Sequence, residues 1–198
     1  MTRGEPVLLF SIPAIRPPIE PRLNSHADVS VRATHVLCAA HGIFLTDEEE
    51  QRATMDDMLR ASAWVYPRAS LPRLVNLAAI FVWMFLADDR DDRATHVQAT
   101  APIPEPVFLG RITADMSPVW TEHFFRNLKD WTASHHDVAR HRHTRTVPTE
   151  AEYVPMRSVT SALVWFYDLI EYANAEDPRQ PGLPVADGIH HRRHHLHQ

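Results

Sequence analysis

The chain has 198 residues, of which 44% are hydrophobic and 23% are charged, and this composition predicts one soluble domain with a sizeable core. Its formal net charge of −5 excludes the strongly basic face with which proteins bind nucleic acid. The single cysteine, Cys38, excludes an internal disulfide and fits a reducing compartment, so we expect a cytoplasmic protein.

Hydrophobic segments are too short for a membrane protein. The longest unbroken apolar run, Leu77–Ala87, falls short of the roughly 20 residues that span a bilayer. The N-terminal apolar patch is interrupted by Pro13 and has no small-residue cleavage site, so we expect neither a membrane span nor a signal peptide.

The sequence predicts three consecutive regions along the chain. Residues 1–26 form a proline-rich strap, residues 27–176 a helical domain, and residues 177–198 a histidine-rich tail. Only 5 glycines and few alternating segments argue against a β-rich fold, so the fold class is all-α. Helices are expected over residues 27–41, 46–66, 71–92, 117–136 and 149–174.

Two of these helices begin with a capping box. Thr46 is followed three residues later by Glu49, and Thr149 by Glu152, which is the pattern that satisfies the first amide groups of a helix.

The helix over residues 71–92 ends in a cluster of acids. Phe81, Phe85, Asp88 and Asp92 are separated by four, three and four residues, so they share one helical face, and Asp89 lies beside them. Acids at a helix C-terminus face the negative end of the helix dipole, which costs roughly 0.3–1 kcal/mol each. A hard divalent cation such as Mg²⁺ would offset that cost, because it binds carboxylates together with phosphates and water.

Two simpler interpretations stay open for this helix. The acids can be a solvated helix end that Arg90 and Arg93 neutralise locally. The stripe of Phe81 and Phe85, which leads from the acids into an apolar interior, can be ordinary core.

The helix over residues 149–174 carries Arg157 on one stripe with apolar and small hydroxyl residues, among them Thr160, Ser161 and Trp165. A buried guanidinium needs an anion, and bidentate binding of a phosphate satisfies it. The alternative is a salt bridge to Glu152 or to an acid elsewhere.

Five segments in this order resemble the bacterial class I terpene synthases: "PRLNSHAD", "ASAWVYPRAS", "FVWMFLADDRDD", "EYVPMRSVTS" and "DLIEYA". The resemblance implies an antiparallel helical bundle of the isoprenoid synthase type. It also implies that Asp88, Asp89 and Asp92 are the metal-binding DDxx(D/E) motif and that Arg157 binds diphosphate. Thr160 and Ser161 would then be the linker and effector residues.

The sequence departs from the family in two places. Ser158 stands where a second arginine is common, and the residues after Arg157 contain no second metal motif of the form NDxxSxxxE. We therefore expect a C-terminally truncated synthase with one metal platform.

The chemistry that the resemblance implies is metal-triggered ionisation of a prenyl diphosphate, farnesyl or geranyl, followed by cyclisation of the carbocation. Mg²⁺ would bridge Asp88 and Asp92 to the diphosphate, and Phe81, Phe85 and Trp165 would line a dry pocket whose aromatic faces stabilise the cation. The alternative is a non-catalytic truncated relative that forms a homo-oligomer over its exposed apolar face.

Histidines gather in two other segments. The tail histidines are spaced for a transition metal, although a polar tail without a specific role explains them as well. His135, His136, His141 and His143 are expected in a solvated basic loop.

Overall fold

The computed structural model describes residues 20–55, 57–93 and 108–175, without the side chains of residues 91–93, 136 and 139. These residues form helices joined by short connections, and no strand occurs among them, which confirms the all-α fold class. The helices are α1 (Ala27–Ala40), α2 (Asp47–Met55), α3 (Met58–Val65), α4 (Leu71–Arg93), α5 (Leu109–Thr113), α6 (Pro118–Thr144), α7 (Glu150–Thr160) and α8 (Leu163–Ala173).

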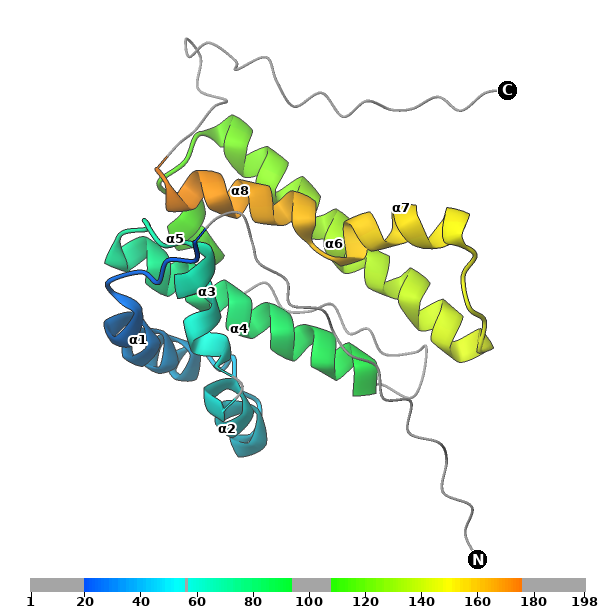
Figure 1. The fold of residues 1–198 in the computed structure, drawn as a ribbon, viewed down its shortest axis with the longest axis horizontal. Coiled ribbons are helices and arrows are strands. Elements are labelled where there is room, and N and C mark those ends of the chain that lie inside the picture. The colour runs from blue at the N-terminus through cyan, green and yellow to red at the C-terminus, as the bar shows by residue number, and fades with distance from the viewer. Residues whose placement is uncertain (1–19, 56, 94–107, 176–198) are drawn as a thin grey trace, which may run out of the picture.

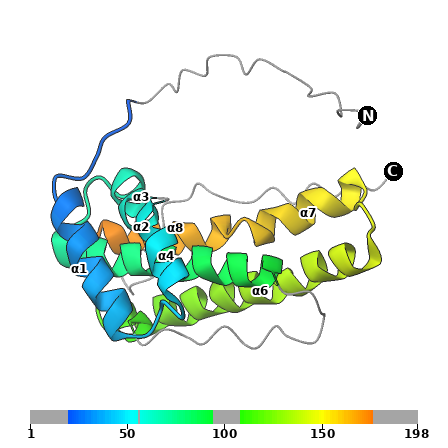
Figure 2. The same ribbon diagram turned by 90° about the horizontal axis from the view of Figure 1, so that it is seen from below.

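Helix α4 runs through the middle of the bundle (Figure 1). Helices α1, α2 and α3 gather at one end of the molecule, whereas α4, α6 and the α7–α8 pair extend along its length (Figure 2). The α7–α8 pair runs in the direction opposite to α6 and packs against it, and α4 packs against α1, α3 and α8. The C-terminal part of α4 thus reaches out from the three-helix end.

Most side chains of α4 from Leu74 to Ala87 are buried, which explains why a helix of 23 residues is so apolar. Its segment Leu71–Arg90 is also long and hydrophobic enough to cross a membrane, but 67% of the most apolar window is buried inside the protein. That burial is the pattern of a core helix in a globular bundle.

An aromatic cluster joins α4, α6 and α8. Trp131 stacks on Trp165 with ring centroids 5.6 Å apart, and Trp83 meets both indoles edge-on at 5.8 and 6.2 Å. Phe124 contacts Trp165 at 5.6 Å. Such pairs add about 0.5–1.5 kcal/mol each beyond the burial of their area. This cluster fixes how α8 lies against the other two helices.

Both long helices that begin with a capping box are interrupted. The helix expected over residues 46–66 is two helices, with Asp57 at a φ of 56°, and the helix expected over residues 149–174 breaks at Ala162, at a φ of 58°. Neither residue is a glycine; aspartate does enter the left-handed region more readily than most residues, whereas alanine at position 162 gave no such signal. The predicted continuous helices were wrong at these two points.

The capping interactions themselves are present. Glu152 accepts a hydrogen bond from the Thr149 N–H at 2.8 Å, and its own N–H reaches the Thr149 hydroxyl. The Glu49 N–H donates to the Thr46 hydroxyl at 3.2 Å, and the Glu49 carboxylate accepts from the Leu45 N–H at 2.7 Å. That carboxylate turns toward α4.

Burial of Cys38 gives a test of the fold. The thiol is fully buried, and burial raises its pKa from 9.0 to about 12. Because the thiolate is the reactive form, we expect an aromatic disulfide reagent at pH 8 to label the unfolded chain at least tenfold faster than the folded protein. The raised pKa also means that this thiol contributes stability below pH 9 that is lost as the pH rises toward 12. Equal labelling rates in buffer and in urea would show that Cys38 is not in the core.

Candidate functional site

The acidic cluster lies at the C-terminal end of α4, and its described carboxylates face different neighbours. The Asp88 side chain is 60% exposed, whereas that of Asp89 is 25% exposed. The side chain of Asp92 lies outside the described residues. Of the two described carboxylates of the motif, that of Asp88 is therefore the more exposed.

Asp89 is held by an arginine of another helix. A guanidinium nitrogen of Arg52, on α2, lies 3.2 and 3.1 Å from the two Asp89 oxygens. Arg90, the next residue on α4, forms a two-pronged ion pair with Glu49 of α2 at 2.8 and 2.7 Å. The Arg90 guanidinium therefore turns to α2, whereas the side chain of Arg93, the other arginine expected to neutralise the acids, lies outside the described residues.

His135 on α6 faces the acidic cluster. Its Nδ1 lies 3.9 Å from the Asp88 carboxylate, and its ring stands edge-on against Trp131 at 4.8 Å. The side chain is 9% exposed. The expectation of a solvated histidine loop was wrong here, because α6 continues to Thr144 and carries these residues as a helix. Sequence reasoning missed His135 as a neighbour of Asp88, although its spacing of four from Trp131 was a usable signal.

Arg157 lies on α7 and is exposed. None of the side chains of α7 is fully buried, so the expectation of a buried arginine on an inner stripe was wrong. An exposed guanidinium remains able to bind an anion that arrives from solvent. Thr160 ends α7, and Ser161 is its C-cap residue, so both fall at the break that separates α7 from α8.

The break between α7 and α8 is strained and buried. Ala162 has a left-handed backbone and only 3% exposure, a combination that costs a non-glycine residue about 1 kcal/mol or more. A small cavity of about 70 Å³ lies beside it, lined by Trp165 and Trp131 among others. Backbone strain of this kind concentrates at functional sites.

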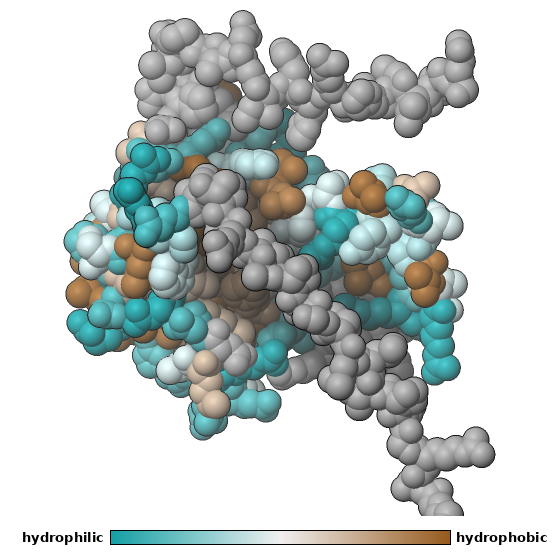
Figure 3. Space-filling view, in the orientation of Figure 1, coloured by the Kyte–Doolittle hydropathy of each residue, from teal (hydrophilic) through white to brown (hydrophobic). Residues whose placement is uncertain are grey.

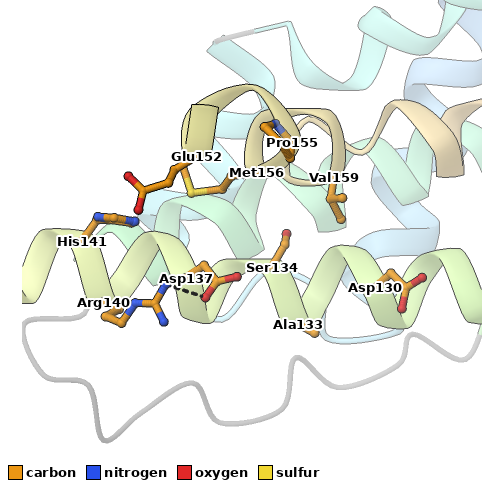
Figure 4. A pocket seen from close by; sticks show the side chains of 10 residues that line it. All are labelled: Asp130, Ala133, Ser134, Asp137, Arg140, His141, Glu152, Pro155, Met156 and Val159. Carbon is orange, nitrogen blue, oxygen red and sulfur yellow. Dashed lines mark ion pairs between the residues drawn. The ribbon is translucent and has the colours of Figure 1, made fainter. Parts of the chain in front are cut away.

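A larger groove of about 510 Å³ lies between α6 and α7. Figure 4 shows Met156 and Val159 of α7 above Ser134 of α6, with the Asp137–Arg140 ion pair, 3.1 Å long, at one side. Arg157 is not among the residues that line it. The groove therefore does not bring Arg157 together with Asp88.

The expected pocket aromatics divide into two groups. Phe81 contacts Phe166 of α8 at 5.3 Å, Tyr66 at 5.9 Å and Phe85 at 6.0 Å. Phe85 is 37% exposed, so this group reaches the surface beside the acidic cluster. Trp165, at 1% exposure, belongs to the core cluster described above. We call Tyr66, Phe81, Phe85 and Phe166 the aromatic wall.

The acids fit a metal ion only in part. An exposed carboxylate such as that of Asp88 is a ligand that Mg²⁺ accepts, whereas the Asp89 carboxylate is engaged by Arg52. Within residues 20–55, 57–93 and 108–175, no group of three or more His, Cys, Asp or Glu side chains is arranged to hold a metal ion. A cation at Asp88 would take its other ligands from Asp92, from a bound phosphate or from water.

Comparisons with known proteins agree with this architecture. Residues 107–180 match the model of terpene synthase family 2, C-terminal metal binding. The matched region includes Arg157, Thr160 and Ser161 but begins after the acidic cluster of α4. No curated protein matches the chain.

Solved terpene synthases have the same fold. The linalool/nerolidol synthase of Streptomyces clavuligerus superposes with a TM-score of 0.69 at 19% identity, over 85% of this chain and 62% of that one. A hedycaryol synthase in complex with HEPES gives a TM-score of 0.72 at 18% identity, over 88% of this chain and 64% of that one. The chain thus spans less than two thirds of each of these structures. Residues 107–180 thus resemble terpene synthase family 2, and the described helices have the fold of solved terpene synthases.

Proposed function

We propose that this chain binds Mg²⁺ and a prenyl diphosphate as part of a class I terpene synthase, a carbon–oxygen lyase that cyclises the resulting carbocation. The observation that carries the proposal is the exposed Asp88 carboxylate at the end of an aromatic core helix, within a terpene synthase fold. Asp88 and Asp92, one helical turn apart, are the proposed metal ligands.

Each residue of the proposed site has its own role in binding the metal or the diphosphate. Asp88 and Asp92 hold the metal, and Arg157, exposed on α7, binds diphosphate oxygens. Thr160 and Ser161 connect that arginine to the strained break at Ala162. Mg²⁺, when bound, neutralises the diphosphate so that it becomes a better leaving group.

The aromatic wall offers the surface for the hydrocarbon part of the substrate. Phe81 packs against Phe85 and Phe166, and Phe85, 37% exposed, carries this group to the surface near the acidic end of α4. A cation–π interaction with such a ring would contribute roughly 0.5–2 kcal/mol. One solved relative is a complex of linalool/nerolidol synthase with 2-fluorogeranyl diphosphate. We therefore propose geranyl or farnesyl diphosphate as the substrate, and a cytoplasmic location, since the one cysteine is a free thiol.

Calorimetry tests the proposal. We expect inorganic diphosphate to bind only when Mg²⁺ is present, and we expect Asp88→Ala and Arg157→Ala each to weaken that binding about tenfold or more, equivalent to roughly 1.4 kcal/mol. Glu122→Ala, which removes an exposed acid of α6, is the matched control and should leave binding unchanged. Binding that ignores both substitutions would reject the proposed site. Incubation with geranyl and farnesyl diphosphates, with gas chromatography of the products, then reads turnover separately from binding.

A second candidate function rests on the surface of α8. Leu163, Tyr167 and Ile170 are 53, 58 and 39% exposed and lie at helical spacing, so they form one apolar face. Other hydrophobic side chains are exposed on α7, and Figure 3 shows hydrophobic patches over this part of the molecule. A non-catalytic relative would use such a face to form a homo-oligomer.

Oligomerisation has its own test. If the α8 face joins two copies, Leu163→Lys with Tyr167→Lys should convert a dimer to a monomer in light scattering, whereas Val36→Lys, at a 67% exposed position of α1, should not. A wild-type chain that is monomeric at all concentrations would remove this candidate.

A further inference from the structure

Two ion pairs connect α2 to the acidic end of α4. Glu49 and Arg52 lie about one turn apart on α2, and Asp89 and Arg90 are consecutive on α4. Glu49 pairs with Arg90 at 2.7 Å, and Arg52 pairs with Asp89 at 3.1 Å. Each helix contributes one acid and one base, so the charges match in only one relative placement of the two helices. We call these four residues the ion-pair brace.

The brace is anchored more firmly than a typical surface pair. The Glu49 side chain is 10% exposed and accepts hydrogen bonds from the Arg90 guanidinium and from the Leu45 N–H. Arg90 also donates to the Ile43 carbonyl at 2.8 Å. Two-pronged arginine–carboxylate pairs fix orientation as well as distance. The brace therefore holds Arg90 in one direction relative to α2.

The orientation of Arg90 toward α2 determines which aspartate at the end of α4 faces the candidate site. Consecutive residues of an α-helix point about 100° apart around its axis. With Asp89 and Arg90 turned to α2, Asp88 points to the side of α4 where His135 of α6 lies. A rotation of the helix end by one residue would present Asp89 in place of Asp88.

We propose that Glu49 and Arg52 are positioning residues of the metal site. They hold the end of α4 in the rotation that presents Asp88, and Arg52 keeps Asp89 out of the ligand set. This inference rests on the proposed function and deepens it, because neither α2 residue belongs to the aspartate motif. It departs from the family-based expectation that Asp89 ligates the metal.

A purely structural role makes a different prediction. Partly exposed ion pairs such as Arg52–Asp89 contribute little to stability on their own. If the brace only stabilises the fold, its loss lowers the melting temperature and leaves metal affinity unchanged. If it positions Asp88, its loss weakens metal binding even at temperatures where the variant is fully folded.

The test is a calorimetric titration of Mg²⁺ with inorganic diphosphate, at a temperature where circular dichroism shows each variant folded. We expect Glu49→Gln and Arg52→Gln each to weaken metal-dependent binding about 10–100-fold, the range found when groups that orient metal ligands are removed. The charge-swapped double variant Glu49→Arg with Arg90→Glu should recover most of the affinity that Glu49→Arg alone loses, because it restores an ion pair at these two positions. Arg60→Gln, which breaks an ion pair to Asp28 at 2.7 Å elsewhere on the surface, is the matched control and should bind as the wild type does.

The outcomes separate the two proposals. A wild-type chain that binds no metal overturns the proposed function, and the positioning role falls with it. A wild-type chain that binds metal, with single brace variants within twofold of its affinity, overturns the positioning role alone. If a single variant does not fold, Arg52→Lys, which keeps the charge but loses the planar guanidinium, decides the case by the same titration.

Discussion

Replacing Trp165 with alanine is expected to lower the free energy of unfolding by about 3–5 kcal/mol, the usual range for removing a large aromatic side chain from a core. Trp165 is 1% exposed and contacts Trp131, Trp83 and Phe124. The cavity left behind would adjoin the existing one of about 70 Å³. Partial collapse of the surrounding helices would therefore not close it. Since the same indole joins α4, α6 and α8, its loss should loosen all three contacts together.

Urea unfolding followed by circular dichroism measures this effect. Tyr167→Ala, two residues further along α8 at a position that is 58% exposed, is the matched control and should change stability by less than about 0.5 kcal/mol. A Trp165 variant as stable as the Tyr167 variant would show that α8 does not pack on the cluster as described.

Replacing Asp168 with alanine is the second large expected effect, a loss of about 2–3 kcal/mol. The Asp168 side chain is 1% exposed, and its two oxygens contact His123 at 2.9 Å and Asn127 at 2.6 Å, both on α6. Hydrogen bonds to a charged group contribute roughly 1.5–3 kcal/mol, and the α6 donors would lose their shared acceptor. This carboxylate is thus a polar link between α6 and α8, beside the aromatic one and the hydrogen bond from the Trp120 indole to Glu171.

Glu122→Ala provides the comparison for Asp168→Ala. Glu122 forms an exposed pair with Arg126 on the same helix at 2.9 Å, and such pairs contribute roughly 0.3–0.5 kcal/mol. Both variants remove one carboxylate from the α6–α8 region, so the difference between them isolates the effect of burial. Equal losses of stability would argue that water, and not the protein, solvates Asp168.

Much of the fold follows from local patterns in the sequence. The apolar content of residues 71–92 predicted a core helix, and α4 covers Leu71–Arg93. A helix was expected over residues 117–136, and it forms the first part of α6, where Trp120, Phe124, Leu128 and Trp131 recur at helical spacing and are all buried. These features are predictable because helical periodicity and capping depend on residues within one or two turns of each other.

The candidate site was predicted only as far as single helices allow. Asp88 at the end of α4 was expected from its motif, and its carboxylate is exposed there. The pairing of Asp89 with Arg52, 37 residues away, was not expected, because no local pattern states which side of α4 meets α2. Burial of His135 was missed for the same reason, and exposure of Arg157 reversed the expectation drawn from its helical stripe.

The sequence by itself determined the helical class, most helix positions, the two capping residues and the resemblance to terpene synthases, because each depends on neighbours along the chain. The tertiary structure alone decided where the helices break and which acids are held by arginines. At Ala162 the buried position at the break between α7 and α8 overrides the backbone preference of alanine, since packing of Trp165 outweighs about 1 kcal/mol of local strain. At the end of α4 the partners come from α2 and α6, so the orientation of Asp88 is a property of the assembled bundle.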